Sequence, residues 1–181
     1  MKQIAFTFVL LSVVVAPAVA SDMYVGVRVG QANTSLDNIT LDSSHPTGWG
    51  AFIGHDFNPN FAVEAEYLNL GEIKSGSNSV KSTGFSVSGI GSIPFNEQFS
   101  LFGKLGYAVI TGKPGGSFTG SDANNRAVTY GFGGQFNITP AVGVRLGWDK
   151  YKFNDNTNPG FNGYGMNGDA TLISIAGLFK F

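Results

Sequence analysis

The chain has 181 residues, 26 of them glycine, and its formal net charge is −1. Charged residues make up 13% of the chain and hydrophobic residues 43%, so the charged share is about half that of a typical soluble domain. A fully water-exposed surface would therefore be short of charge. The balanced charge gives no basic excess for nucleic acid, and the absence of cysteine excludes a disulfide framework and a cysteine-based metal site.

The first twenty residues have the pattern of a secretory signal. Lys2 supplies the positive start, residues 4–15 form an apolar core, and Ala18-Val19-Ala20 forms a cleavage site of the A-x-A type. The apolar run is shorter than the ~20 residues that a membrane-spanning helix needs. We therefore expect residues 1–20 to be a signal peptide and residues 21–181 to be one domain, which could cross a membrane only by strands.

From residue 22 onward, apolar residues alternate with small or polar ones in segments of about ten residues, a period of two that is typical of strands. Short joints rich in Pro and Asn alternate with longer polar joints. The short joints are 58–60, 94–98 and 138–141, and the long ones are 34–46, 72–82, 111–125 and 153–168. The predicted strands are 22–33, 47–57, 61–71, 83–93, 99–110, 126–137, 141–152 and 169–181. An even number of antiparallel strands with short turns at one end and long loops at the other is the plan of an outer-membrane barrel.

The two faces of these strands distinguish two kinds of barrel. A soluble barrel of the lipocalin type has its apolar face inside, whereas a membrane barrel turns that face to lipid. Here the face opposite the apolar residues is dominated by Gly, Ser and Ala with few charges, which suits a crowded interior better than a solvated exterior. The sequence thus predicts an all-β fold, an eight-stranded antiparallel up-and-down transmembrane β-barrel with short periplasmic turns and long extracellular loops.

Aromatic residues on the apolar face lie at two heights. Beside the short turns are Phe57, Phe61, Phe99, Phe136 and Phe181. Six to eight residues further along the strands are Trp49, Tyr67, Tyr107, Tyr130 and Trp148. For tilted strands this separation corresponds to roughly 15–20 Å, which predicts two interfacial girdles around an apolar band.

These features resemble a known family, the small eight-stranded outer-membrane proteins of the outer membrane protein A transmembrane-domain type, which include the opacity-like surface proteins. The resemblance rests on Tyr24-Val25-Gly26, residues 50–69, Lys104-Leu105-Gly106-Tyr107, residues 130–148 and Phe181. It implies a bacterial outer-membrane location, with the membrane lipid and the barrel-assembly machinery as partners. It also implies that Phe179 and Phe181 belong to the assembly signal, and that host-surface or matrix molecules are partners of the loops.

Six ionisable residues fall on the inward face: Arg28, Glu64, Glu66, Lys104, Arg145 and Asp149. An eight-stranded barrel has an interior just wide enough for side chains to fill, and unpaired charges there are costly. We therefore predict a network in which Glu64 and Glu66 meet Lys104 and Arg145. The resemblance implies that Glu64, Lys104 and Arg145 contribute to a network that plugs or gates the lumen. A fixed structural plug and a gate for ions or water both remain open.

Enzymatic chemistry is not indicated. The two histidines are His45, in the first long joint, and His55, on the lipid-facing parity, and neither shares a strand face with a candidate serine. Residues 112–116 lack the spacing of a phosphate loop, and residues 154–158 lack the closing glutamate of a calcium loop. We expect no cofactor, no metal and no enzyme activity. The predicted function is a structural or surface-interaction role, such as adhesion or host contact, through the extracellular loops. The alternatives are a narrow porin-like channel for ions or small polar solutes and a soluble lipocalin-like binder.

Overall fold

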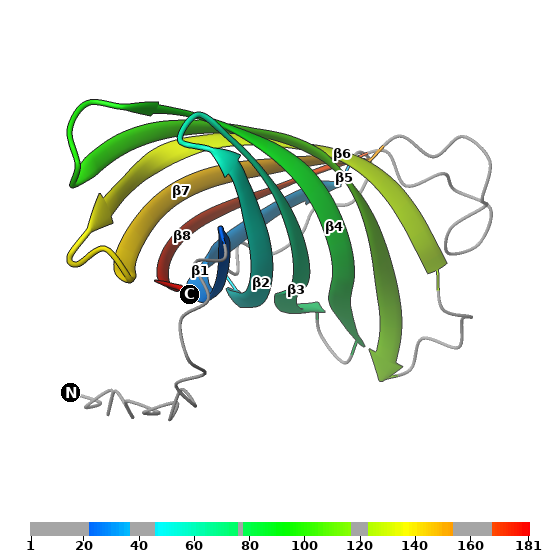
Figure 1. The fold of residues 1–181 in the computed structure, drawn as a ribbon. Coiled ribbons are helices and arrows are strands. Elements are labelled where there is room, and N and C mark those ends of the chain that lie inside the picture. The colour runs from blue at the N-terminus through cyan, green and yellow to red at the C-terminus, as the bar shows by residue number, and fades with distance from the viewer. Residues whose placement is uncertain (1–21, 37–45, 76–77, 117–122, 154–167) are drawn as a thin grey trace, which may run out of the picture.

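A computed structural model describes residues 22–36, 46–75, 78–116, 123–153 and 168–181. These residues form a closed barrel in which each antiparallel strand pairs with the next in chain order and the last pairs with the first (Figure 1). The strands are β1 (Met23–Leu36), β2 (Thr47–Asn58), β3 (Phe61–Ser75), β4 (Asn78–Pro94), β5 (Phe99–Gly116), β6 (Ala123–Asn137), β7 (Val142–Phe153) and β8 (Gly168–Lys180). The predicted fold class is confirmed. The predicted signal segment, residues 1–20, lies outside the described residues.

The three short turns lie at the predicted short joints and are each closed by a polar side chain of the joint, an Asn in the first two and Thr139 in the third. Asn58 Oδ1 accepts the backbone N–H groups of Asn60 and Phe61, at 2.9 and 3.0 Å. Asn96 Oδ1 accepts those of Gln98 and Phe99 in the same way. In the third turn Thr139 Oγ1 accepts the N–H groups of Ala141 and Val142. Each turn thus uses a short polar side chain in place of a backbone acceptor.

The strands are longer at the opposite end than the sequence predicted. The segment 72–82, expected to be a loop, is mostly paired backbone, because β3 and β4 continue their ladder to Ser75 opposite Asn78. Strand β5 likewise continues beyond residue 110 to Gly116. Ser, Thr, Asn and Gly have weak strand propensity, but a neighbouring strand that already supplies hydrogen-bond partners overrides that preference.

One irregularity interrupts this extended hairpin. The register shifts between Asn69 and Gly71, where Gly71 has a φ of +86°. The Gly71 N–H donates to Asn69 Oδ1 at 2.9 Å. A positive φ is accessible to glycine at low cost, so this β-bulge bends the hairpin where it leaves the main body of the barrel.

Large apolar side chains cover the outside of the barrel. Phe57, Leu105 and Phe132 each expose more than 60% of their surface. Such exposure costs free energy in water but not in the hydrocarbon of a membrane. Within the described residues no helix is long and apolar enough to cross a membrane.

The interior is more apolar than the sequence pattern suggested. It contains large buried side chains: Tyr24, Phe52, Leu68, Leu70, Ile90, Phe102, Ile110, Tyr151, Leu172 and Leu178. Phe52 and Phe102 were missed because each stands between or beside outward apolar residues and so hides the alternation. The glycines and serines of the inward face leave the space that these side chains fill.

Candidate functional site

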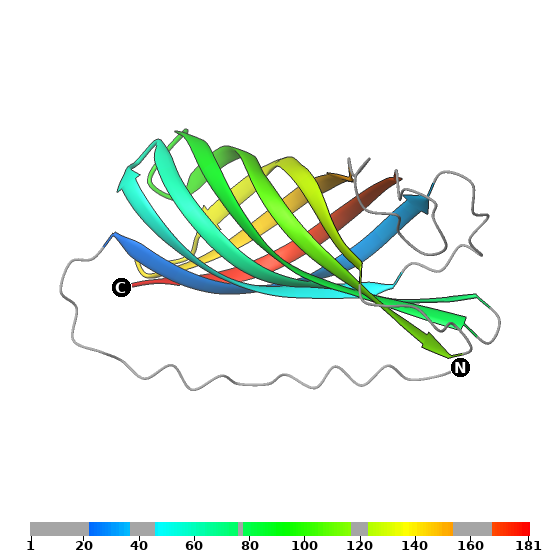
Figure 2. The ribbon, with the colours of Figure 1, turned by 90° about the vertical axis from the view of Figure 1, so that its right-hand side faces the viewer.

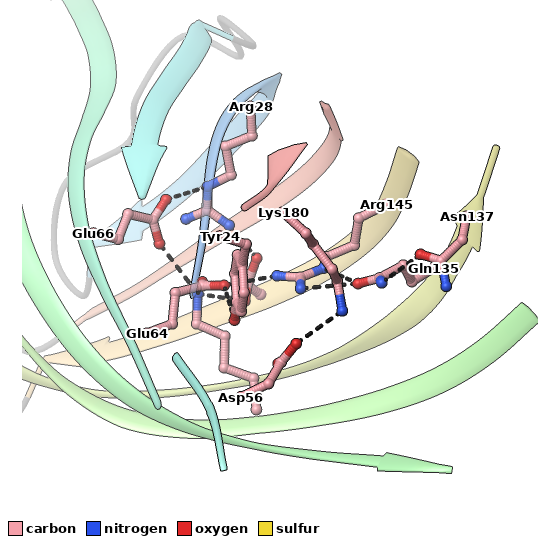
Figure 3. Close-up of polar contacts among 11 residues, drawn as sticks. Tyr24, Arg28, Asp56, Glu64, Glu66, Gln135, Asn137, Arg145 and Lys180 are labelled. Atoms are coloured by element: carbon pink, nitrogen blue, oxygen red, sulfur yellow. Dashed lines mark hydrogen bonds and ion pairs between the residues drawn. The ribbon is translucent and has the colours of Figure 1, made fainter. Parts of the chain in front are cut away.

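All six predicted inward ionisable residues point into the lumen. We call this set the lumen network: Arg28, Glu64, Glu66, Lys104, Arg145 and Asp149 (Figure 3 labels four of them). Three cations face three carboxylates, so their formal charges cancel. Their side chains are at most 12% exposed, which makes pairing necessary.

Glu64 of β3 is the acceptor at the centre of one half of the network. Arg145 Nη1 donates to Glu64 Oε2 at 2.7 Å, and Lys104 Nζ lies 3.4 Å from Glu64 Oε1. The Tyr24 hydroxyl also donates to Glu64 Oε2, at 3.2 Å. Two cations and a hydroxyl therefore satisfy one buried carboxylate, and they reach it from three other strands.

The other half of the network is organised by Arg28 of β1. Its Nη1 donates to Asp149 Oδ2 at 2.5 Å, its Nη2 donates to the Tyr151 hydroxyl at 2.5 Å, and its Nε pairs with Glu66 Oε1. Lys104 Nζ lies 3.1 Å from Glu66 Oε2 and 3.8 Å from Asp149 Oδ1. Lys104 thus joins the two halves.

The structure pairs Glu66 differently from the expectation. The predicted network joined Glu64 and Glu66 to Lys104 and Arg145; Glu66 does contact Lys104, but its second cation is Arg28, and Arg145 pairs with Glu64. The reason is local: a side chain at Gly50 would come within 2.6 Å of Glu66 Oε1 and 3.3 Å of Arg28 Nε. The bare backbone of Gly50 therefore makes room for the Arg28–Glu66 pair.

Arg145 lies in an aromatic cage that the sequence pattern did not predict. Its guanidinium carbon lies 4.9 Å from the ring centroid of Phe102 and 5.5 Å from those of Tyr24 and Phe52. The Nε and Nη2 atoms donate to Gln135 Oε1, at 3.2 and 3.0 Å. Cation–π contacts strengthen when the cation is desolvated, so the cage holds Arg145 in one position. The inward position of the Tyr24 side chain could have been predicted, because Tyr24 alternates with the outward Val25.

An apolar layer closes the lumen on the long-loop side of the network. It consists of Ala32, Leu68, Leu70, Ala108, Ile110, Ala127, Tyr151, Ala170 and Leu172, none more than 4% exposed. On the short-turn side a polar cavity of about 250 Å³ opens, lined in part by Asp56, Gln135, Arg145 and Lys180. A space of about 20 Å³ within the network is enough for about one water molecule. The barrel is thus filled by the charged network at mid-height and by buried apolar side chains toward the loops.

The ten residues of the two predicted girdles lie on the outward face, where Tyr67 and Trp148 are half-buried by neighbouring rings. Trp148 packs on Phe132 and Tyr130 with centroids 5.3 and 6.2 Å apart, and Trp49 packs on Tyr67 at 5.6 Å. The rings of Phe179 and Phe181 stack at 6.4 Å, and their role in assembly stays a prediction.

The described residues offer few side chains that could serve in catalysis or bind a metal ion. His55 lies outside the lumen, edge-on to Phe57 at 5.0 Å, and His45 is outside the described residues. The described residues contain no group of three side chains placed to hold a metal ion.

Outward aromatics, a filled interior that holds paired charges, and strands closed in chain order define a membrane-spanning β-barrel. The chain belongs to the outer membrane protein beta-barrel domain family, whose model matches residues 6–176. This places the described barrel in the bacterial outer membrane.

Solved structures share the fold at low identity. Neisserial surface protein A matches with a TM-score of 0.71 and 16% identity, covering 89% of this chain and 98% of that one. The attachment invasion locus protein of Yersinia pestis matches at 0.59 and 19%, covering 88% and 99%. The N-terminal β-barrel domain of OprF from Pseudomonas aeruginosa matches at 0.60 and 11%, covering 88% and 98%. No curated protein matches the chain.

Proposed function

We propose that this barrel is a surface-interaction protein that acts through its extracellular end, without enzyme activity, and that adhesion or host contact is its role. The observation that carries the proposal is that the lumen is filled while the long joints all lie at one end of the barrel. The lumen is closed by the apolar layer and the lumen network, so the part of the chain available to a partner is the end with the long joints.

That end also carries a projecting sheet. Gly116 lies nine residues beyond the girdle residue Tyr107 on β5, and for a tilted strand this corresponds to roughly 20 Å. Phe153 ends β7 only five residues beyond Trp148. The ends of β3, β4 and β5 accordingly project past the other strands (Figure 2). A hydrogen-bonded sheet above the membrane surface is a firm base for loops that contact a partner.

Two structural neighbours have names and ligands that fit such a role. One is a surface protein, and the Yersinia pestis attachment invasion locus protein was also solved in complex with the heparin analogue sucrose octasulfate. At 16–19% identity these proteins share the fold with this chain, and their ligands suggest only the class of partner. We take host-surface or matrix molecules as that class, beside the outer-membrane lipid and the barrel-assembly machinery that such a barrel needs.

The proposal is tested by shortening the loops one at a time. Residues 37–45, 117–122 and 154–167 are each replaced by a short Gly/Ser linker, and bacteria displaying each variant are scored for binding to host cells and to immobilised matrix proteins. Loss of binding in at least one variant is expected. Equal binding by all variants and by cells without the protein would contradict the proposal. A heat-dependent shift in gel migration shows that each barrel is folded, and Gly103→Ala, at an outward site with nothing within 4 Å, is the matched control.

A further inference from the structure

A cluster of basic side chains lies on the lipid-facing surface near the loop end of β6 and β7. This basic patch consists of Arg126, Lys150 and Lys152. Arg126 and Lys152 are exposed and Lys150 is half-buried. All three share the outward parity of Tyr130 and Trp148, so their side chains point away from the lumen and toward the membrane.

Strand register brings the three residues together. Lys152 is directly opposite Val128, and Lys150 is directly opposite Tyr130. Arg126 lies two residues beyond Val128 on β6, and it is therefore a diagonal neighbour of Lys152, at about 7–8 Å between Cα atoms. Long basic side chains at that spacing can contact one small anion together.

The height of the patch suggests which anion. Lys150 and Lys152 follow the girdle residue Trp148 by two and four residues, which places them about 5 and 10 Å above it along a tilted strand. Girdle aromatics mark the boundary of the hydrocarbon. The patch therefore lies at the level of the lipid headgroups in the outer leaflet.

The charge of the patch remains positive after its internal pairing. Lys150 Nζ contacts Asp169 Oδ2 at 2.7 Å, and both side chains are partly exposed. Three cations and this one carboxylate leave two positive charges. Asp169 stands directly opposite Lys152 in the strand register, but its carboxylate pairs with Lys150. Within the part of the chain that the structure describes, Arg126 and Lys152 are therefore the two cations of the patch whose charge is left for an external anion.

We propose that the basic patch binds the phosphate group of a phosphorylated lipid in the outer leaflet. Arg126 offers a planar pair of donors that suits phosphate oxygens, and Lys152 adds a point charge. Trp148 and Tyr130, directly below, contact the same lipid at the junction of its headgroup and acyl chains. The site rests on the outer-membrane orientation and is independent of the loops that the proposed function uses.

The test uses the folded full-length barrel in zwitterionic detergent micelles and lipid A that carries two phosphates. Two single-tryptophan forms are used: Trp49→Phe keeps Trp148 beside the basic patch, and Trp148→Phe keeps Trp49 on another strand of the same girdle. The outward neighbours of Trp49 on β1 and β2 are uncharged, namely Val29, Gln31 and Thr47, so Trp49 is the internal control. We expect a saturable change in Trp148 fluorescence and no comparable change at Trp49.

The double variant Arg126→Gln/Lys152→Gln should bind this lipid on the order of tenfold more weakly, because each basic residue at a membrane surface contributes appreciable attraction to anionic lipid. Lys81→Gln is the matched control, since Lys81 is an exposed outward lysine on β4, and it should stay within about twofold. Both variants must retain the heat-dependent gel shift.

Three outcomes would overturn the proposal. The double variant could bind as tightly as the native barrel, lipid A without phosphates could bind equally well, or both tryptophans could respond alike. A soluble anion is the competing occupant. If sucrose octasulfate or inorganic pyrophosphate bound the patch more tightly than the phosphorylated lipid, the site would belong to that soluble class instead. Binding to host cells plays no part in this measurement, so its outcome is separate from that of the loop deletions.

Discussion

Arg145 of β7 donates a 2.7 Å hydrogen bond to Glu64 of β3, a residue 81 positions earlier in the chain. The two strands are not neighbours in the sheet, so the contact spans the lumen. The same guanidinium is enclosed by three aromatic rings. One side chain therefore ties together opposite walls of the barrel.

Replacing Arg145 by Met should destabilise the barrel by about 3–5 kcal/mol, the usual cost of leaving a buried partner charge uncompensated. The double variant Glu64→Gln/Arg145→Met should lose less than the sum of the two single changes, because it removes both charges. Urea unfolding in lipid vesicles, followed by tryptophan fluorescence, measures the free energies of unfolding.

A second ion pair provides the control for this cycle. Lys180 Nζ and Asp56 Oδ2 lie 2.8 Å apart, but their side chains are 35% and 29% exposed. Water weakens such a pair, so Lys180→Gln should cost no more than about 1 kcal/mol. If Lys180→Gln and Arg145→Met lowered the free energy of unfolding by the same amount, burial would not explain how the lumen network stabilises the barrel.

Alternation alone was enough to predict the barrel and the inward position of the network, because each strand face meets a different environment. The predicted contacts of Glu64 with Lys104 and Arg145 and of Glu66 with Lys104 are present, but the partners of Arg28 could not be predicted. Those depend on which glycines leave space, as Gly50 does for Arg28 and Glu66. The apolar layer was not predicted either. Leu68 and Leu70 stand near the end of the predicted strand, directly after the outward Tyr67, and the residues that follow have weak strand propensity. The inward position of these two leucines was therefore not evident from the sequence.

Gly54 should tolerate no side chain. A methyl group there would overlap the ring of Tyr24, which is buried and hydrogen-bonded to Glu64. Gly54→Ala should therefore destabilise the barrel by about 1–3 kcal/mol, as expected for overpacking. Gly103→Ala, where nothing lies within 4 Å, should be neutral or slightly stabilising. Urea midpoints compared in the same vesicles give the answer, and a smaller loss at Gly54 than at Gly103 would contradict this packing.

The lumen network should not be the barrier to ion flow by itself. The apolar layer lies between the network and the loop end, and its side chains are almost fully buried; we expect such a constriction to block ions by remaining dry. In planar bilayers we expect no steady current from the native barrel, from Glu64→Gln or from Arg145→Met. Steady openings in either network variant would favour the channel over the surface-interaction role. Leu68→Ala/Leu172→Ala, which thins the apolar layer, serves as the comparison variant.

The two tryptophans should report the membrane boundary directly. Trp49 and Trp148 lie in the girdle on the loop side, each packed against another outward aromatic ring. Phosphatidylcholine brominated near the glycerol end of its acyl chains should quench both more strongly than lipid brominated near the chain ends, because aromatic girdles lie at the headgroup level. The single-tryptophan forms separate the two signals. A soluble barrel with its apolar face inside would show no quenching by either lipid, and stronger quenching from the chain ends would place both rings at the centre of the bilayer.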